Sequence, residues 1–410
     1  MKRTSFVAIA FSVVFSGCVS SASRPDYPTD LLTITVDVGR NDDGKLIDSI
    51  LEFSHYVILD PQQEVLIGKI KKLQLLDGHI GVASENKAYV FDSTGRLVHC
   101  WDRQGRGPNE YLQMTDMEIG REKDWVCHVY DKNAGKLLTY DMDDKAVSVK
   151  EMIPHAKAFK LLGDGLIAFN MGNGSSTFLQ KEDYFNYRCI DSFGKTRISA
   201  VPFNKQMFGL STQYDKGKSF FYRYGEQIYM SAQHNDTIYQ VSDTSGRITP
   251  CLVFDLGVER PRADDENYPI SNYQKGLGGE KPEVPVAFYK FPNGYLAEYT
   301  YDFRPYVLIA NEQGEILYTG NSARDKNGVL LRPVPYLDFD NSGYLISYFS
   351  PVNIEADKKI GRRKGCDSAL LDELSLKVSE NSNPVLLFYI QKSGDTVRSA
   401  DAWTESKRIL

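Results

Sequence analysis

The stretch YVFDSTGRLVHCW, from Tyr89 to Trp101, decides the fold. It reads as an apolar strand, a turn of the form Asp-x-x-Gly, and a second strand that begins with a charged residue. Asp favours the start of a tight turn, and Gly95 can take the positive φ that such a turn needs. The stretch therefore predicts a β-hairpin.

The same pattern recurs five more times along the chain. The further copies start at Leu138, Arg188, Tyr239, Val307 and Leu387. The turn position of the six copies falls at Gly95, Asp144, Gly194, Gly246, Gly314 and Gly394, with successive spacings of 49, 50, 52, 68 and 80 residues. Asp144 stands where the other copies have glycine. This departure from the pattern is mild, because Asp adopts the left-handed backbone conformation more readily than most residues. The pattern predicts a repeat fold.

A second hairpin precedes most copies, for example LLGDGLIAFN from Leu161. Two hairpins make four antiparallel strands, and about 50 residues is the length that one propeller blade requires. The sequence therefore predicts an all-β fold, a six-bladed β-propeller of four-stranded antiparallel blades over residues 31–410. A ring of sheets must be closed, and the alternating stretch from Leu31 to Gly39 is expected to complete the last blade as an extra strand.

Two insertions explain the longer late spacings. One is the Pro-, Gly- and charge-rich segment between the fourth and fifth copies, which is expected to be a loop. The other precedes the sixth copy, and there Asp367 and Ser368 are placed to cap a short helix near 367–380. The basic run from Lys358 to Lys364 is expected to be a solvated loop, with contact to an anionic partner as the alternative.

The N-terminus predicts export. Lys2 and Arg3 precede a short apolar run, and small residues then lead to Cys18, as in a bacterial lipoprotein signal. We expect residues 1–17 to be a signal peptide, Cys18 to be lipidated, and residues 18–30 to be a tether. The expected location is the cell envelope as an outer-membrane lipoprotein, on the periplasmic side because no acidic run follows Cys18.

Composition limits the classes of partner and site. The formal net charge is −6, which argues against a nucleic-acid binder. Five cysteines follow Cys18, and they show no CxxC spacing, so neither a zinc site nor an obligatory set of disulfides is expected. No two of the six histidines stand at metal-ligand spacing. We expect no cofactor and no metal from local motifs.

Three stretches carry a resemblance to a known family. They are VILDPQQEVLIGKIKKLQLLDG from Val57, GRGPNEY from Gly105 and YGEQIYMSAQHNDTIYQV from Tyr224. With the lipoprotein signal, the chain resembles the six-bladed β-propeller lipoproteins of Bacteroides-type bacteria, which are related to NHL- and TolB-like propellers. The resemblance covers nearly all of the mature chain. It implies the fold and says little about function, because propellers host many activities.

The GRGPNEY stretch allows two interpretations. It lacks Gly-Lys-Ser/Thr and a following helix pattern, so it is not a phosphate-binding P-loop. The favoured interpretation is a crossing between two blades, in which Arg106 and Glu110 pair locally and Tyr111 packs between blades. The alternative is a ligand-contact loop that uses Arg103, Arg106, Asn109, Glu110 and Tyr111.

No catalytic motif is evident, and no GxSxG stands in a strand–turn–helix context. The leading hypothesis is a non-catalytic binding or scaffold module, held at the membrane by its lipid, for a glycan, peptide or protein partner. The alternative is a lactonase- or lyase-like propeller enzyme with a metal in the central channel, assembled from residues scattered over several blades. Convergence of carboxylates, histidines or amides on the channel axis would favour that alternative.

Overall fold

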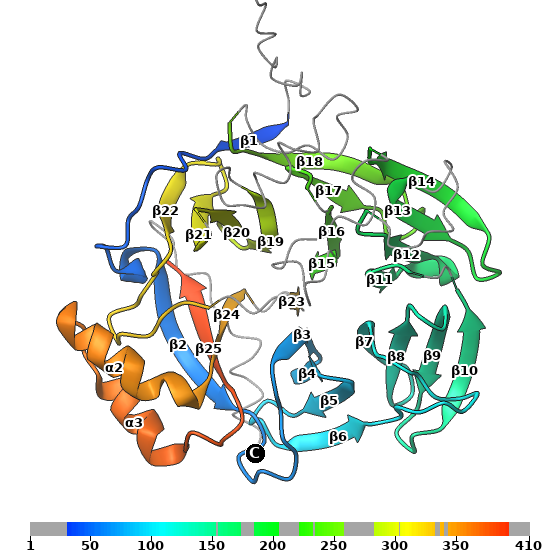
Figure 1. The fold of residues 1–410 in the computed structure, drawn as a ribbon, viewed down its shortest axis with the longest axis horizontal. Helices are drawn as coiled ribbons and strands as arrows, with labels where there is room; N and C mark the ends of the chain where they lie inside the picture. Colours follow the sequence, from blue (N-terminus) through cyan, green and yellow to red (C-terminus); the bar gives the residue numbers. More distant parts are fainter. Residues whose placement is uncertain are drawn as a thin grey trace, which may run out of the picture.

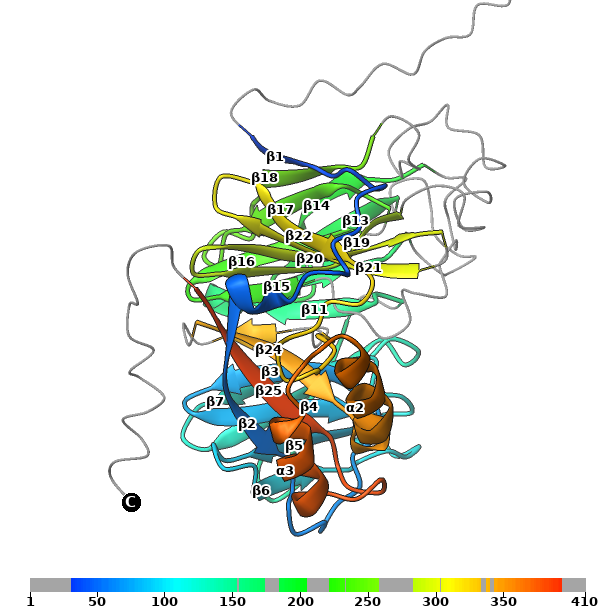
Figure 2. The same cartoon turned by 90° about the vertical axis from the view of Figure 1, so that its left-hand side faces the viewer.

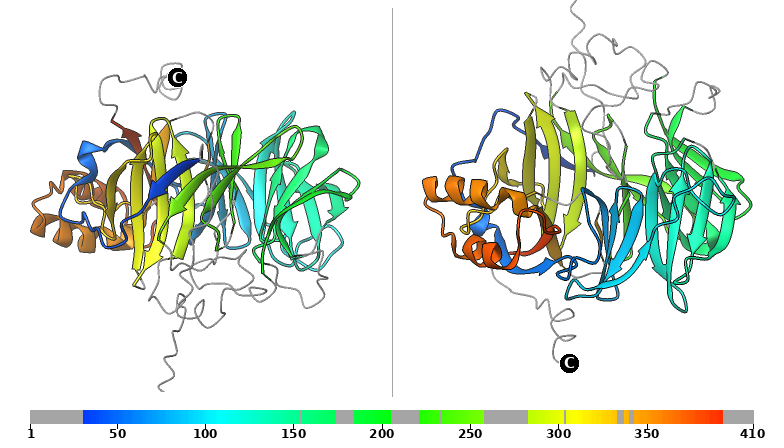
Figure 3. Two further views of the ribbon diagram at one scale, coloured as in Figure 1. Left: turned by 90° about the horizontal axis from the view of Figure 1, so that it is seen from above. Right: turned by 60° about the horizontal axis from the view of Figure 1, so that its bottom comes forward.

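Six blades are arranged in a ring around a central axis (Figure 1), which confirms the predicted all-β six-bladed propeller. The structure is a computed structural model that describes residues 31–392 except 153–154, 174–183, 205–220, 233, 258–282, 303, 333–336 and 340–342. The predicted signal peptide, Cys18, the tether and the turn at Gly394 lie outside the described residues. Figure 3 shows the ring edge-on, as a disc whose strands run between its two faces.

Five blades contain four antiparallel strands each. Blade one consists of β3 (Ile70–Leu76), β4 (His79–Ser84), β5 (Lys87–Phe91) and β6 (Leu97–Trp101). Blade two consists of β7 (Asp116–Arg121), β8 (Trp125–Asp131), β9 (Lys136–Tyr140) and β10 (Ala146–Glu151). Blade three consists of β11 (Ala158–Leu161), β12 (Ile167–Asn170), β13 (Phe185–Ile190) and β14 (Thr196–Pro202), with the 3-10 turn η2 (Gly163–Gly165) between its first two strands.

Blades four to six complete the ring. Blade four consists of β15 (Phe221–Tyr224), β16 (Gln227–Ser231), β17 (Thr237–Val241) and β18 (Ile248–Asp255). Blade five consists of β19 (Glu283–Phe291), β20 (Gly294–Tyr301), β21 (Arg304–Asn311) and β22 (Ile316–Gly320). The sheet of blade six contains β24 (Tyr344–Phe349), β25 (Val385–Gln391) and β2 (Leu51–Ile58).

The repeated Asp-x-x-Gly stretch forms the predicted hairpin turn. Asp92 Oδ1 accepts backbone N–H groups from Thr94 at 2.8 Å and Arg96 at 3.1 Å, and Gly95 has φ +88°. Asp141, Asp191 and Asn311 accept the same two N–H groups in their own blades. A register shift of one residue accompanies the turn in blade one, as in a hairpin with a glycine bulge.

The ring is closed by β2, not by the stretch from Leu31 to Gly39. β2 pairs antiparallel with β25, which lies between β2 and β24. A strand from the N-terminal part of the chain therefore supplies the outer edge of the last blade, as expected in general, but the predicted segment is wrong. The outer position next to β25, predicted for the strand after Gly394, is already taken by β2.

The segment from Leu31 forms β1 (Leu32–Thr35), which lies on a different blade. β1 pairs parallel with β18, with Leu32 opposite Leu252 and Thr35 opposite Asp255. Ile34 is fully buried against the turn at Gly314 of blade five. The alternation predicted a strand correctly, but it did not identify which open sheet edge the strand covers. The 3-10 turn η1 (Ile47–Ser49) then leads into β2.

Two helices stand on the outer rim of blade six (Figure 2). They are α2 (Ile354–Arg363), which follows the 3-10 turn η5 (Pro351–Asn353), and α3 (Ala369–Lys377). The predicted helix near 367–380 is confirmed as α3. The expected loop from Lys358 to Lys364 is wrong, because most of this run belongs to α2. Within the described part of the chain, neither helix has the length and apolar character needed to cross a membrane.

The strand β23 (Leu337–Phe339) precedes β24 in the chain but lies near the axis of the ring (Figure 1). It pairs parallel with β3 of blade one and with β15 of blade four. The stretch LDFDNSGYLISYFS from Leu337 has the sequence pattern of a hairpin, but among the described residues β23 does not pair with β24. The innermost strands of two blades on opposite sides of the axis are instead joined through this segment.

Candidate functional site

The innermost strands of blades one to three form a buried, charged wall. Lys72 on β3 forms an ion pair of 3.0 Å with Asp116 on β7. Lys160 on β11 forms a second ion pair, of 2.6 Å, with Glu118 on β7. All four side chains are almost completely removed from solvent. Each carboxylate thus meets an ammonium group from a neighbouring blade.

The carboxylates of this wall are also bound to backbone amides. Asp116 accepts N–H groups from Met117 at 2.8 Å and from Phe159 at 3.0 Å. Glu118 accepts the N–H of Leu161 at 2.9 Å. These bonds satisfy the buried charges, which would otherwise carry a large desolvation penalty.

Gln74 completes the wall between blades one and two. Its side-chain oxygen accepts the N–H of Ile119 at 2.7 Å, and its amide nitrogen donates to the carbonyl of Ile119 at 3.4 Å. Two carboxylates and one amide thus lie on the adjacent inner strands β3 and β7. Their ligating atoms, however, are used by lysines and by backbone, and β23 lies alongside β3.

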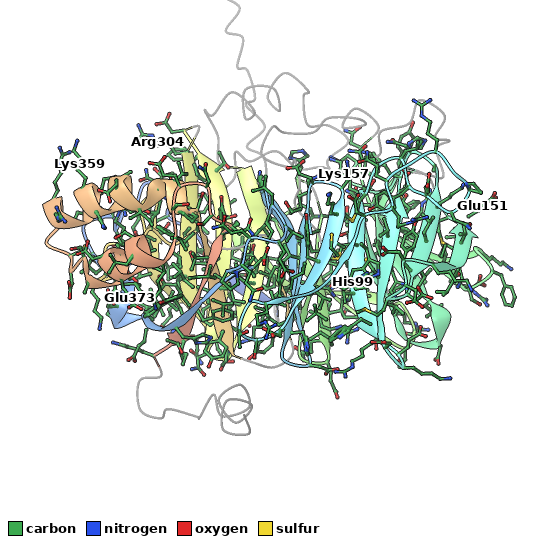
Figure 4. All side chains as sticks on the ribbon, turned by 90° about the horizontal axis from the view of Figure 1, so that it is seen from below. His99, Glu151, Lys157, Arg304, Lys359 and Glu373 are labelled. Atoms are coloured by element: carbon green, nitrogen blue, oxygen red, sulfur yellow. The ribbon has the colours of Figure 1, made fainter. Side chains whose placement is uncertain are left out.

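One face of the disc carries the turns between the second and third strands of each blade together with the crossings to the next blade. In an antiparallel blade both kinds of connection leave the sheet at the same end, because the second and the fourth strand run in the same direction. We call this side the loop face. Its described parts in blades one to four include Glu85–Asn86, 102–115, Lys132–Gly135, 155–157, Met171–Asn173 and His234. Lys157 and Arg304 lie toward one side of the disc in Figure 4.

The GRGPNEY stretch lies on the loop face as the crossing from β6 to β7. Glu110 folds back over its glycines, and its Oε2 accepts the N–H of Gly107 at 2.8 Å. The N–H of Gly105 donates to the carbonyl of Tyr111 at 3.0 Å. A Cβ at Gly105 would require the Glu110 carboxylate to move. The crossing is therefore a compact, internally bonded loop.

Tyr111 anchors this crossing between blades one and two. Its ring is fully buried, and it packs edge-on against Tyr140 of β9 at a centroid distance of 6.2 Å. Its hydroxyl donates to the carbonyl of Asn86 at 2.6 Å. Asp131, at the end of β8, accepts the N–H of Leu112 at 2.7 Å. The buried Tyr111 thus holds the crossing in place from the interior of the propeller.

The other four predicted residues of the loop lie nearer its surface. Arg106 and Asn109 are exposed, and Arg103 and Glu110 are half-buried. Asn109 still contributes its carbonyl, which accepts the Tyr140 hydroxyl at 3.0 Å. Among the described residues, the Nε of Arg103 is buried without a hydrogen-bond partner. A role of these side chains toward a ligand stays a prediction.

On the loop face of blades two to four, positive φ occurs at His155 (+69°), Asn173 (+59°) and His234 (+55°), and Val201 (+57°) lies near the end of β14. Other non-glycine residues with positive φ, Asp77, Asp144 and Asp164, lie in turns on the opposite face. Positive φ is a genuine outlier for a β-branched residue such as Val201. Backbone strain of this kind costs about 1–3 kcal/mol per residue and gathers at functional sites. These positions were not predicted from the sequence.

Buried amides hold the strained turn of blade three in place. Asn186 Nδ2 donates to Asn173 Oδ1 at 2.9 Å, and Asn186 Oδ1 accepts the N–H of Asn173 at 2.6 Å. Asn170 Nδ2 reaches the carbonyl of Ser231 at 3.0 Å, which connects blade three to blade four. The stretch Asn170–Asn173 contains two asparagines and Gly172, and this was the available signal in the sequence.

The thiols of Cys100 and Cys251 do not have the properties of activated nucleophiles. Burial raises the pKa of Cys100 to about 11 and that of Cys251 to about 12, so thiolate is scarce at neutral pH. Burial lowers the pKa of His128, whose Nδ1 lies 2.9 Å from the Thr139 hydroxyl. Among the described residues, no three His, Cys, Asp or Glu side chains group as a metal site.

These features define a six-bladed β-propeller. Its channel wall has paired charges, and the backbone of its loop face is held by internal hydrogen bonds. Within this class, the chain belongs to the family described as "Domain of unknown function (DUF4934)", which matches residues 32–390. A comparison with curated proteins finds no match.

The chain is similar to several solved structures. A Bacteroides fragilis protein whose name suggests export is 17% identical, with a TM-score of 0.67 over 88% of this chain and 99% of that chain. A Bacteroides vulgatus member of the DUF4221 family is 14% identical, with a TM-score of 0.47 over 84% and 99%. Virginiamycin B lyase from Staphylococcus aureus is 14% identical, with a TM-score of 0.36 over 72% and 78%. The likeness to the Bacteroides fragilis protein shows a shared fold.

Proposed function

We propose that the protein is an exported propeller, anchored in the cell envelope by a lipid on Cys18, that binds a glycan, peptide or protein partner through its loop face. The basic start, the apolar run and the small residues before Cys18 support export and lipidation. The proposed location is the periplasmic side of the outer membrane.

The observation that carries the binding function is the strained, clamped backbone of the loop face. On this face, His155, Asn173 and His234 hold positive φ. Buried amides of Asn170 and Asn186 fix the turn at Asn173. A surface that is rigid before a partner arrives loses little conformational entropy on binding. Such strain is maintained only where the surrounding contacts over-determine it.

Arg103, Arg106 and Asn109 are the proposed contact residues of the crossing on this face. Arg106 and Asn109 are exposed on a loop whose backbone is fixed by Glu110 and Tyr111. Their guanidinium and amide groups can donate to the hydroxyl and carbonyl oxygens of a glycan or a peptide. Catalysis in the channel is less well supported, because Lys72 and Lys160 already neutralise Asp116 and Glu118.

A binding screen with matched variants tests this proposal. The chain from Ser20 onward, which keeps every described element, is applied to glycan and peptide arrays. For each ligand found, Arg106→Ala/Asn109→Ala is expected to weaken binding at least about tenfold, since it removes several donors from the contact. The control is Phe193→Ala/Lys195→Ala, which changes two exposed residues of a turn on the opposite face. Equal affinity of both variants would contradict binding through this crossing.

Lipidation is tested separately by mass spectrometry of the protein extracted from membranes. The expected mature N-terminus is an acylated Cys18, and Cys18→Ala is expected to release the chain from the membrane fraction. An unmodified N-terminus beyond residue 18 would contradict the anchor and leave the binding proposal standing.

A further inference from the structure

Helix α2 presents an exposed face that combines cations with apolar side chains. Lys359, Arg362 and Arg363 are exposed on this helix. Val352, in the preceding turn η5, is 60% exposed, and Ile360 is 37% exposed. Val352, Ala356 and Ile360 follow one another at intervals of four residues, so they lie along one side of the helix.

The three cations of this face have no ion-pair partner among the described residues. Other charges of the two helices are paired. Lys358 lies 2.8 Å from Asp372 and 3.4 Å from Glu355, and Lys377 lies 2.7 Å from Glu373. The exposed side of α2 therefore carries an excess of positive charge, with one exposed acid, Glu355, beside Lys359. The chain as a whole has a formal net charge of −6.

The opposite side of α2 is fixed to the propeller. The buried Asp357 accepts from Arg324 at 2.9 Å and from Arg332 at 3.2 Å. Gly361 packs against the backbone of Gly328, and a Cβ there would lie 3.0 Å from the Gly328 Cα. The helix is thus attached rigidly, and its exposed face is ready for contact without rearrangement.

We infer that this face of α2 docks onto an anionic lipid surface and orients the disc relative to the membrane. Cations attract acidic headgroups, and apolar side chains enter the interface, as in interfacial helices. Figures 1 and 2 show the two helices standing out from the rim, where a flat membrane can reach them. The interleaved Val352 and Ile360 favour lipid over an acidic protein. The inference rests on the proposed location at the envelope.

The test is sedimentation of the chain from Ser20 onward with phosphatidylcholine vesicles, with and without phosphatidylglycerol. The chain carries no acyl group, so the result does not depend on lipidation of Cys18. Binding is expected only with phosphatidylglycerol and is expected to fall with salt. The variant Lys359→Gln/Arg362→Gln/Arg363→Gln is expected to bind these vesicles about 100-fold more weakly. Each of the three cations contributes a similar share of the attraction to an anionic membrane.

Two further variants make the outcome specific. Lys123→Gln/Lys195→Gln/Arg247→Gln removes three exposed cations on other blades and is expected to keep binding. The variant Val352→Ser/Ile360→Ser is expected to weaken binding to the phosphatidylglycerol vesicles. Equal loss in both triple variants, or no binding to phosphatidylglycerol, would overturn the inference. Equally tight binding to polyglutamate, with no effect of the serine variant, would overturn it in favour of an acidic protein. Neither result would affect ligand binding at the loop face.

Discussion

Gly95 occupies the point where the first blade meets the strand that closes the ring. Its φ is +88°, and its carbonyl accepts the N–H of Asp60 at 2.7 Å. A Cβ at this position would collide with the carbonyl oxygen of Ile58, at the end of β2. The residue therefore combines two requirements, a left-handed turn and a close backbone approach, that glycine alone meets.

Substitution at two equivalent turns separates these requirements. Gly95→Ala is expected to lower the free energy of unfolding by more than about 3 kcal/mol, because it adds a backbone collision to the strain of positive φ. Gly194, with φ +80°, has open space around its Cβ position. Gly194→Ala should cost only about 1 kcal/mol. Urea denaturation of both variants makes the comparison, and equal losses would contradict the collision.

Asp48 gives the stability a pH dependence. Burial raises the pKa of this carboxyl, whose Oδ2 has no hydrogen-bond partner among the described residues. A raised pKa means that the protonated form is favoured by folding, so this contribution to stability is complete below the ordinary value of about 4. It is lost as the pH rises through the folded-state pKa.

The substitution Asp48→Asn should remove this loss of stability at high pH, because the side chain no longer ionises. The variant is expected to be more stable than the wild type at pH 7, and the difference should shrink as the pH falls toward 4. Urea midpoints of both proteins across this range measure the effect. A constant difference at every pH would show that the carboxyl does not titrate differently in the folded chain.

At the scale of the element, the inner strands depend on paired charges. Lys72→Met leaves the buried Asp116 carboxylate without its ammonium partner, and the expected loss of stability is about 3–5 kcal/mol. The double variant Lys72→Met/Asp116→Asn should recover part of it, because the uncompensated charge is gone. Thermal and urea unfolding test the pair. A loss below about 1 kcal/mol in the single variant would contradict neutralisation by Lys72.

The strands and turns were predictable because their causes are local. Period-2 alternation and the Asp-x-x-Gly turn recur in each blade, and the turn works through a carboxylate or amide two residues before the N–H that it accepts. Helix α2 was missed because its cause is distant in sequence. Arg324 and Arg332 bind Asp357 and thereby hold a strongly charged segment against the propeller as a helix.

At the scale of the whole molecule, the order in which strands close the ring was not predictable from alternation. The alternation from Leu31 predicted the strand β1, whereas β2 was not predicted. Only tertiary pairing distinguishes the outer edge of blade six from that of blade four. The channel wall was equally hidden, since Lys72, Asp116, Glu118 and Lys160 lie on three blades and share no spacing. The crossing with GRGPNEY was located correctly, because glycine, proline and position between two blades are local signals.

Truncation distinguishes the roles of the two N-terminal strands. A chain that starts at Gly39 lacks β1 and should still form a closed propeller. Its stability should be lower, because the packing contacts of the buried Ile34 are lost. A chain that starts at Gln62 lacks β2 and should fail to fold, since it leaves β25 with an open edge and the ring unclosed. Circular dichroism and size-exclusion chromatography report the outcome. A folded monomer without β2 would contradict closure by this strand.

The central claim is that the channel is a neutralised structural wall and that the loop face is the working surface. Elemental analysis of the chain from Ser20 onward, purified without chelators, tests it most directly. The account predicts no stoichiometric divalent ion, because Lys72 and Lys160 hold the carboxylates of Asp116 and Glu118. One calcium or zinc per chain, lost in Asp116→Asn/Glu118→Gln, would contradict the account and favour a metal-dependent enzyme in the channel.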